Sequence, residues 1–159
     1  MKTFRIGGVH PAENKLSAAE PIKVAELPKV AVFPMGQHIG APALPVVQKG
    51  DKVKVGTLIA KPMENALSTS IFSSVSGTVL KVDTVVDASG YKKPAVYVSV
   101  EGDEWEESID RSDKLVTLKD KPELTPEQII EKVKNAGIVG MGGACFPTHV
   151  KLMPPPQFK

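Results

Sequence analysis

Short apolar runs that alternate with polar residues dominate the chain between residues 28 and 102. Valine, leucine and isoleucine recur within brief runs, a pattern that is typical of β-strands. The residues concerned are Val30, Val32, Val53, Val55, Leu58, Ile59, Ile71, Val79, Val82, Val96, Val98 and Val100. Turn-forming residues separate the runs, at Gly36, Gly40, Gly50-Asp51, Gly56, Gly77 and Ser89-Gly90. This spacing predicts a small barrel or sandwich of strands and disfavours a βαβ unit.

The pattern changes on both sides of this β region. Residues 1–27 contain few periodic apolar positions and hold turn formers such as Gly7-Gly8 and Pro11, so we expect an extended lead-in. Residues 103–122 are charged and weakly patterned, with Pro122 at their end, and are interpreted as a linker. The acidic residues around Trp105 indicate a solvated surface, and a partner contact through the tryptophan is the alternative.

A helix start follows the linker. Thr125 is placed as the N-cap, Pro126 occupies the first helical position, and Gln128 can reach back to complete a capping box. Gly137 can end the helix in the left-handed conformation. A second helix is expected to begin after Thr148. The apolar face of the first helix consists of Ile129, Ile130, Val133 and Ala136, and the predicted stop of the second consists of Pro154, Pro155 and Pro156.

Composition narrows the class of protein. The 159 residues are 42% hydrophobic and 24% charged, the balance of a folded globular chain with room for one domain and part of another. Twenty basic and eighteen acidic residues give a formal charge of +2, so nucleic acid is not an expected partner. No apolar stretch approaches the roughly 18 residues of a membrane span, so any membrane association is expected to go through partner subunits.

Cys145 is the only cysteine among the 159 residues. It excludes an intrachain disulfide and favours a reducing compartment, and one thiol cannot hold an iron–sulfur cluster, which needs about four cysteines. Cys145 is interpreted either as a reactive thiol or as a small buried side chain. The three histidines, His10, His38 and His149, are far apart in the sequence and show no metal-ligand spacing.

Two stretches of the β region together resemble the barrel-sandwich hybrid of biotinyl and lipoyl carrier domains. The first runs from Val47 to Ala60 and includes Gly50-Asp51, and the second runs from Ile71 to Val79 and includes Gly77. In such carriers a modified lysine stands on an exposed hairpin before the second glycine, and the corresponding residue here is Ala66. An amide-linked prosthetic arm requires an amine, so we expect no carrier function. A plain β domain that supports its neighbour is favoured over a docking module.

A glycine-rich loop connects the two predicted helices. It reads Gly-Ile-Val-Gly-Met-Gly-Gly-Ala-Cys-Phe-Pro from Gly137 to Pro147. Gly140, Gly142 and Gly143 allow the backbone to approach a phosphate closely, with N–H groups facing the negative charge, and Lys151 can add a positive charge beside it. On spacing alone a cofactor loop and an ordinary glycine-rich turn are equally good interpretations, because neither a Gly-x-Gly-x-x-Gly nor a P-loop pattern is present.

The stretch from Gly140 to Thr148 resembles the flavin-binding loop of the NADH-oxidising subunit of respiratory complex I. It reads Gly-Met-Gly-Gly-Ala-Cys-Phe-Pro-Thr here, against Gly-Arg-Gly-Gly-Ala-Gly-Phe-Pro-Thr-Gly and a following lysine in that subunit. Met141 and Cys145 depart from the pattern, whereas Lys151 keeps the lysine. Together with the stretches from Phe4 to Lys15 and from Gln37 to Pro42, this order of motifs is similar to that of the RnfC proteins of Rnf complexes, the ion-translocating ferredoxin:NAD oxidoreductases.

This resemblance implies a mainly β chain. A barrel-sandwich hybrid (residues 28–102) would precede the beginning of an α/β FMN- and NADH-binding domain (residues 123–159). The implied cofactors are FMN and NAD(H), with 4Fe–4S clusters in a part that these 159 residues lack, and the implied partners are ferredoxin and the other subunits of the complex. The expected location is the cytoplasmic side of a bacterial plasma membrane, as a peripheral subunit. The implied cofactor contacts are Gly140, Gly142, Gly143, Ala144 and Lys151, with Phe146 as a wall for a ring.

Two functions from different classes follow. The first is the front part of an NAD:ferredoxin oxidoreductase subunit, which by itself is expected to have no redox activity because the flavin domain is incomplete. The second is a noncatalytic adaptor or docking module of the biotinyl/lipoyl-like kind. Such adaptors normally interrupt the barrel with a long helical hairpin, and the stretch from Met63 to Ser70 is too short for one. This difference favours the first function.

Overall fold

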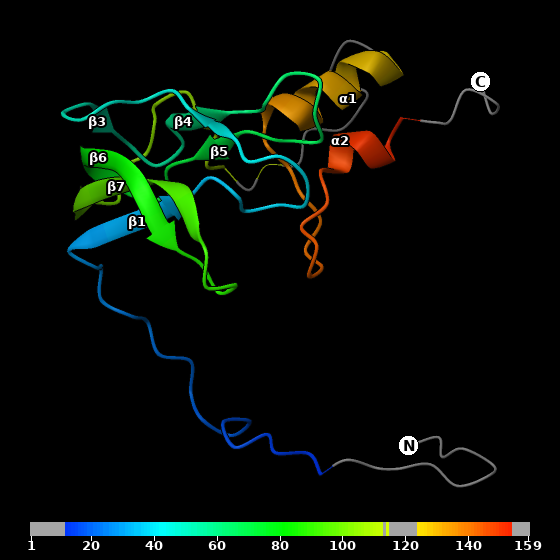
Figure 1. Ribbon diagram of the computed structural model, residues 1–159. Coiled ribbons are helices and arrows are strands. Elements are labelled where there is room, and N and C mark those ends of the chain that lie inside the picture. Colours follow the sequence, from blue (N-terminus) through cyan, green and yellow to red (C-terminus); the bar gives the residue numbers. More distant parts are fainter. Residues whose placement is uncertain (1–11, 113, 115–123, 154–159) are drawn as a thin grey trace, which may run out of the picture.

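The computed structural model describes residues 12–112, 114 and 124–153, in which a two-sheet β domain is followed by two helices (Figure 1). The strands are β1 (Val30–Pro34), β2 (Leu44–Pro45), β3 (Lys52–Val53), β4 (Leu58–Lys61), β5 (Ile71–Phe72), β6 (Ser76–Val86) and β7 (Lys92–Gly102). The helices are α1 (Pro126–Asn135) and α2 (Thr148–Lys151). The chain is therefore mainly β, as its apolar pattern predicts.

The strands pair in two antiparallel sheets. The larger sheet has the order β1-β7-β6-β3, and the smaller has the order β2-β4-β5. β6 and β7 form a long, strongly curved hairpin (Figure 1), and in its turn the Ser89 N–H donates a hydrogen bond of 2.9 Å to the Asp87 carboxylate. The predicted turn at Ser89-Gly90 is thus confirmed. β2 was not predicted, because two residues among prolines show no alternating pattern.

Both sheets contribute to one hydrophobic core. On β7, Val96 and Val98 are fully buried while Tyr97 between them is half-buried, which is the period of two expected of a strand with one face inward. Burial of side chains of this size stabilises the fold by about 1.5–3 kcal/mol each. The runs predicted as strands supply most of the core, whose other members are Phe33, Met35, Ala43, Val53, Ile59, Ala60, Ile71, Val75 and Val79.

Gly77 of β6 packs tightly against β7. A Cβ atom at this position would collide with the carbonyl oxygen of Ser99 on β7. The ladder also shifts register between Ser76 and Gly77, so the missing side chain coincides with an irregularity in the pairing. This packing gives a physical reason for the glycine in the second motif stretch.

Hydrogen bonding with the β domain continues into the segment predicted as a linker. The Val55 N–H donates to the Glu104 carbonyl at 2.8 Å, and the Glu106 N–H donates to the Val55 carbonyl at 3.0 Å. Trp105 thereby pairs with Val55, and the Arg111 guanidinium lies 4.7 Å from the centroid of the Trp105 ring. Residues 113 and 115–122 of this segment lie outside the described residues.

α1 begins with the predicted capping box. The Gln128 N–H donates to the Thr125 hydroxyl at 3.3 Å, and the Thr125 N–H donates to the Gln128 side-chain oxygen at 2.9 Å. No residue of α1 is buried, although Ile130 and Val133 are half-buried. The helix therefore presents an apolar face that the described part of the chain only partly covers.

The N-terminal end of the described chain has no regular secondary structure, whereas the C-terminal end contains α2. Residues 12–29 contain no helix or strand and run away from the β domain (Figure 1). Residues 1–11, with Gly7, Gly8 and His10, lie outside the described residues. α2 begins at Thr148, as predicted, and its predicted stop at residues 154–156 also lies outside them.

Candidate functional site

The glycine-rich loop is a tight hairpin between α1 and α2. Gly137 ends α1 with φ +67°, which confirms the predicted left-handed helix end. The Gly140 N–H then donates to the Phe146 carbonyl at 2.9 Å, and the Thr148 N–H donates to the Ile138 carbonyl at 3.0 Å. These two bonds close the base of the hairpin and leave residues 141–145 as its tip.

The tip presents unpaired backbone amides. The Cys145 N–H donates to the Gly142 carbonyl at 3.0 Å, with Cys145 at φ +44°. Within the described part of the chain, the N–H groups of Gly142, Gly143 and Ala144 donate to no acceptor. Cβ atoms built at Gly142 and Gly143 would meet nothing within 4 Å. The tip is therefore open to close approach and carries adjacent unpaired N–H donors, which suit an anion.

Lys151 and Phe146 lie together at the base of the loop. The Lys151 ammonium is 5.6 Å from the centroid of the Phe146 ring and 3.1 Å from where a Cβ atom of Gly140 would stand. The absence of a side chain at Gly140 thus leaves room for the lysine. The structure brings Gly140, Phe146 and Lys151 together, and it places Gly142, Gly143 and Ala144 at the tip of the same hairpin.

A loop of the β domain contacts the tip directly. The Ile39 N–H donates a hydrogen bond of 2.9 Å to the Ala144 carbonyl. A cavity of about 340 Å³ lies between residues 36–39 and residues 143–145. His38, in its wall, accepts a hydrogen bond of 3.3 Å from the Thr69 N–H. No role in the site was predicted for this loop. The available signals were its flanking glycines, Gly36 and Gly40, and the resemblance of the stretch from Gln37 to Pro42 to RnfC proteins.

The end of α1 is also fixed against the β domain. A Cβ atom at Gly137 would lie 2.7 Å from the Ser70 carbonyl oxygen and 3.0 Å from the Phe72 ring. Gly137 therefore serves two purposes, since it adopts a left-handed conformation and permits close packing on β5. The glycine-rich loop begins from a point that the β domain holds in place.

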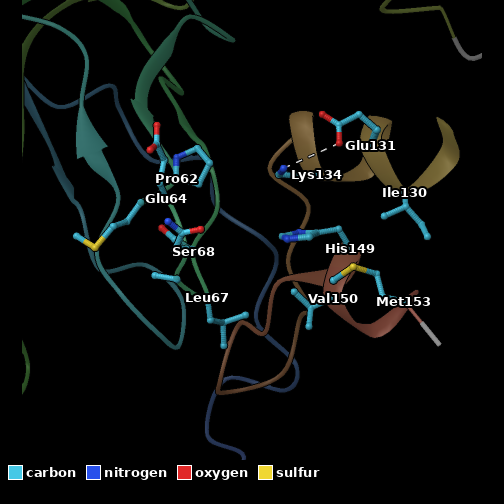
Figure 2. A pocket seen from close by; sticks show the side chains of 13 residues that line it. Pro62, Glu64, Leu67, Ser68, Ile130, Glu131, Lys134, His149, Val150 and Met153 are labelled. Carbon is cyan, nitrogen blue, oxygen red and sulfur yellow. Dashed lines mark ion pairs between the residues drawn. The ribbon is translucent and has the colours of Figure 1, made fainter. Parts of the chain in front are cut away.

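A second, larger cavity lies between the β4–β5 connection and the two helices (Figure 2). We call it the helix groove: it measures about 670 Å³, and its walls are residues 62–68 on one side and side chains of α1 and α2 on the other. His149 is 8% exposed, and its ring points from α2 toward residues 62–68 (Figure 2). Burial lowers the pKa of His149 below its usual 6.5, the Lys134 ammonium lowers it further, and Glu131 opposes the shift.

Other candidates show no comparable arrangement. The Cys145 thiol is half-buried and lies 3.6 Å from the Gly142 carbonyl oxygen, so both interpretations of this residue stay open. No group of three or more metal-ligating side chains occurs in the described ranges. Ala66 is exposed in the turn between β4 and β5, at the position where carrier domains have their modified lysine.

Comparison with known proteins identifies the family. Residues 2–103 match the family described as the RnfC barrel sandwich hybrid domain. The chain belongs to this family. Its β domain is therefore a barrel-sandwich hybrid, as the two motif stretches predict, and the RnfC assignment extends through Asp103. The glycine-rich loop lies beyond the matched residues.

Relatives extend the match to the whole chain. It is 44% identical to the RnfC-type subunit of the proton-translocating ferredoxin:NAD(+) oxidoreductase complex of Clostridium ljungdahlii, with 100% of the chain and 34% of the relative covered. It is 42% identical to the counterpart in the Na(+)-translocating complex of Acetobacterium woodii, over 99% of the chain and 34% of the relative. The corresponding subunit of the ion-translocating oxidoreductase complex of Rhodobacter capsulatus is 39% identical over 96% of the chain and 29% of the relative. The predicted resemblance to RnfC proteins is confirmed, and the chain spans about a third of the length of these relatives.

Neither helix in the described part of this RnfC-family chain has the length and apolar character needed to cross a membrane.

Proposed function

We propose that the chain is the N-terminal part of the RnfC subunit of a bacterial ion-translocating ferredoxin:NAD(+) oxidoreductase complex. In this proposal the complete subunit exchanges electrons between NADH and ferredoxin through FMN and 4Fe–4S clusters. It lies at the cytoplasmic side of the plasma membrane and is attached there through the other subunits. The 159 residues supply the barrel-sandwich hybrid and the first loop of the flavin domain, and they have no redox activity alone.

One observation carries the proposal: the tip of the glycine-rich loop has three adjacent unpaired amides in a chain whose relatives are named as subunits of such complexes. Unpaired N–H groups without neighbouring side chains are suited to a phosphate, because several donors can reach the same anion. The N–H groups of Gly142, Gly143 and Ala144 therefore suit the phosphate group of FMN.

Each residue of the loop has a separate part in this proposal. Gly142, Gly143 and Ala144 would donate to the phosphate, and Lys151 would balance its charge from the base of the hairpin. Gly140 makes room for Lys151, and Phe146 would border the ring system. Bound FMN would supply the chemistry that accepts a hydride from NADH and releases single electrons. Gln37, His38 and Ile39 of the β domain would hold the tip in the conformation that binds.

The noncatalytic adaptor is the alternative, and two observations disfavour it. β4 and β5 are joined by a short turn, so the long helical hairpin of such adaptors is absent from this place in the described chain. The chain also continues from the barrel into α1, the glycine-rich loop and α2, which an adaptor of that kind would not need. Ala66 excludes attachment of a prosthetic group at the carrier position.

The test uses the complete polypeptide in its assembled complex. We expect the coding sequence to continue past Lys159 into a part with two cysteine-rich cluster motifs. The purified polypeptide should contain FMN, iron and acid-labile sulfide, and the complex should reduce ferredoxin or NAD(+) in a flavin-dependent reaction. A complete protein that ends at Lys159, or one that contains neither flavin nor iron, would refute the proposal.

A further inference from the structure

The helix groove is separate from the glycine-rich loop and has features of an unfinished interface. It lies between residues 62–68 of the β domain and the helices that flank the loop (Figure 2). At about 670 Å³ it is roughly twice the size of the cavity at the loop tip, which measures about 340 Å³. None of the residues proposed to contact the cofactor lines it.

Two polar side chains in its walls are buried without hydrogen-bond partners. Ser68 and His149 are 4% and 8% exposed, and neither the Ser68 hydroxyl nor His149 Nδ1 has a partner in the described structure. They belong to opposite walls, one on the β4–β5 connection and one on α2 (Figure 2). Buried polar atoms are normally paired. Both atoms are enclosed by the chain in this structure, so an occupant of the groove would pair with them only if its walls adjust around it.

The rest of the lining is apolar or balanced in charge. Leu67, Ile130, Val150 and Met153 contribute apolar surface. Lys134 and Glu131 face each other across 4.0 Å at one edge, and Glu64 stands on the opposite wall (Figure 2). A free phosphate would find one lysine beside two carboxylates, which does not favour an anion. A neutral polypeptide segment with apolar side chains fits this lining, and its backbone could pair with Ser68 and His149 where the walls adjust.

We propose that the helix groove is filled by a downstream segment of the same polypeptide. The inference rests on the proposed function in one respect, namely that the chain is the front of a longer subunit. The relatives are about three times as long as the part that the chain covers, so ample polypeptide is available. Met153, the last described residue, is itself in the groove wall, so the chain leaves the described structure at the edge of the groove.

The segment would also support the glycine-rich loop, which α1 and α2 flank. It would cover the exposed apolar surface of α1 and bridge α1, α2 and the β4–β5 connection. Ala66, which stands where carriers have their lysine, lies on the rim of the groove. The connection that presents a prosthetic arm in carriers would here receive a segment of its own chain.

The experiment measures access to this rim by thiol labelling. Ala66→Cys is compared with Ala88→Cys, since Ala88 in the β6–β7 turn is exposed as well, and both are made in a Cys145→Ser background. Each variant is made in the 159-residue chain and in the complete subunit, and the labelling rate is read by peptide mass spectrometry. Labelling at residue 66 should be at least about tenfold slower in the complete subunit, while labelling at residue 88 should be the same in both.

Equal labelling at residue 66 in the two proteins would overturn the inference. Protection that appears only after the other subunits are added would also overturn it, because the occupant would then be a partner. The outcome is separable from the proposed function: a complete subunit that binds FMN but leaves residue 66 open refutes only the groove occupant. Protection without bound flavin would instead support the occupant and refute the cofactor assignment.

Discussion

The backbone N–H of Ile39 lies 2.9 Å from the carbonyl oxygen of Ala144 and donates a hydrogen bond to it. The bond joins a loop of the barrel-sandwich hybrid to the tip of the glycine-rich loop. Because the neighbouring N–H groups of the tip are unpaired in the described part of the chain, this contact fixes the carbonyl side of the tip and leaves its donors free. The barrel is therefore part of the structure that shapes the proposed cofactor site.

Replacement of Gly137 by alanine should destabilise the docking of α1 on the barrel. An L-residue in the left-handed conformation costs about 1–2 kcal/mol, and the new Cβ atom would press on the Ser70 carbonyl at 2.7 Å. We expect the helical circular dichroism signal to be lost at a lower temperature in Gly137→Ala. Gly142→Ala is the matched control, because its Cβ atom meets nothing within 4 Å. Equal melting of the two variants would contradict the described packing of Gly137.

Replacement of Gly77 by alanine should weaken the barrel itself. The added methyl group collides with the Ser99 carbonyl of the paired strand, and because the atoms that it meets all belong to the backbone, little room is left to relax. We expect the free energy of unfolding in urea to fall by roughly 2–4 kcal/mol. Gly36→Ala, whose Cβ atom has open space, should stay within about 0.5 kcal/mol of the parent chain. If Gly77→Ala were as stable as Gly36→Ala, the tight contact described between Gly77 and the Ser99 carbonyl of β7 would be wrong.

The stability of the chain should decrease on mild acidification through His149. Its pKa is lowered in the folded state by burial and by Lys134, so the unfolded chain binds more protons than the folded one near neutral pH. The contribution of neutral His149 is complete above about 6.5, the usual pKa, and is lost as the pH falls through the lowered pKa. Urea unfolding of the parent chain should therefore show a fall in stability between about pH 7.5 and 5.5.

His149→Gln is the matched variant for this experiment, because it keeps a polar side chain that does not titrate. The fall in stability over the same pH range should be smaller in this variant. Asp83, Asp87 and Glu101 also have shifted pKa values, but theirs are lowered from about 4, so they titrate below the range. Identical pH dependence in the two proteins would show that His149 is not the responsible group.

The local parts of the fold were accessible from the sequence. Period-two valines such as Val96 and Val98 predict strands because one face of each strand is buried, and Thr125 and Gln128 predict a helix start because their hydrogen bonds are made within one turn. Gly137 was predicted to end α1 for the same local reason. Such features depend on neighbours in the sequence, so a single sequence contains the information.

The contacts between distant segments were not accessible. Nothing in the pattern of Gln37, His38 and Ile39 predicts that a backbone N–H there reaches Ala144, because the residue type of a backbone donor is nearly arbitrary. The burial of His149 against residues 62–68 likewise depends on how α2 packs on the barrel. The glycine-rich loop was found by its composition, whereas its hairpin form and its adjacent unpaired amides required the structure.

Titration of FMN into the apo form of the complete subunit measures whether the glycine-rich loop holds this cofactor. The parent protein should bind one FMN per chain, and Lys151→Ala should weaken binding by about tenfold, or about 1.4 kcal/mol, because a phosphate partner is lost. Lys49→Ala, an exposed lysine of the barrel, should bind as the parent does. The 159-residue chain should bind FMN weakly or not at all. A complete subunit that binds no FMN, or a Lys151→Ala variant that binds it as tightly as the parent, would contradict the assignment of the glycine-rich loop.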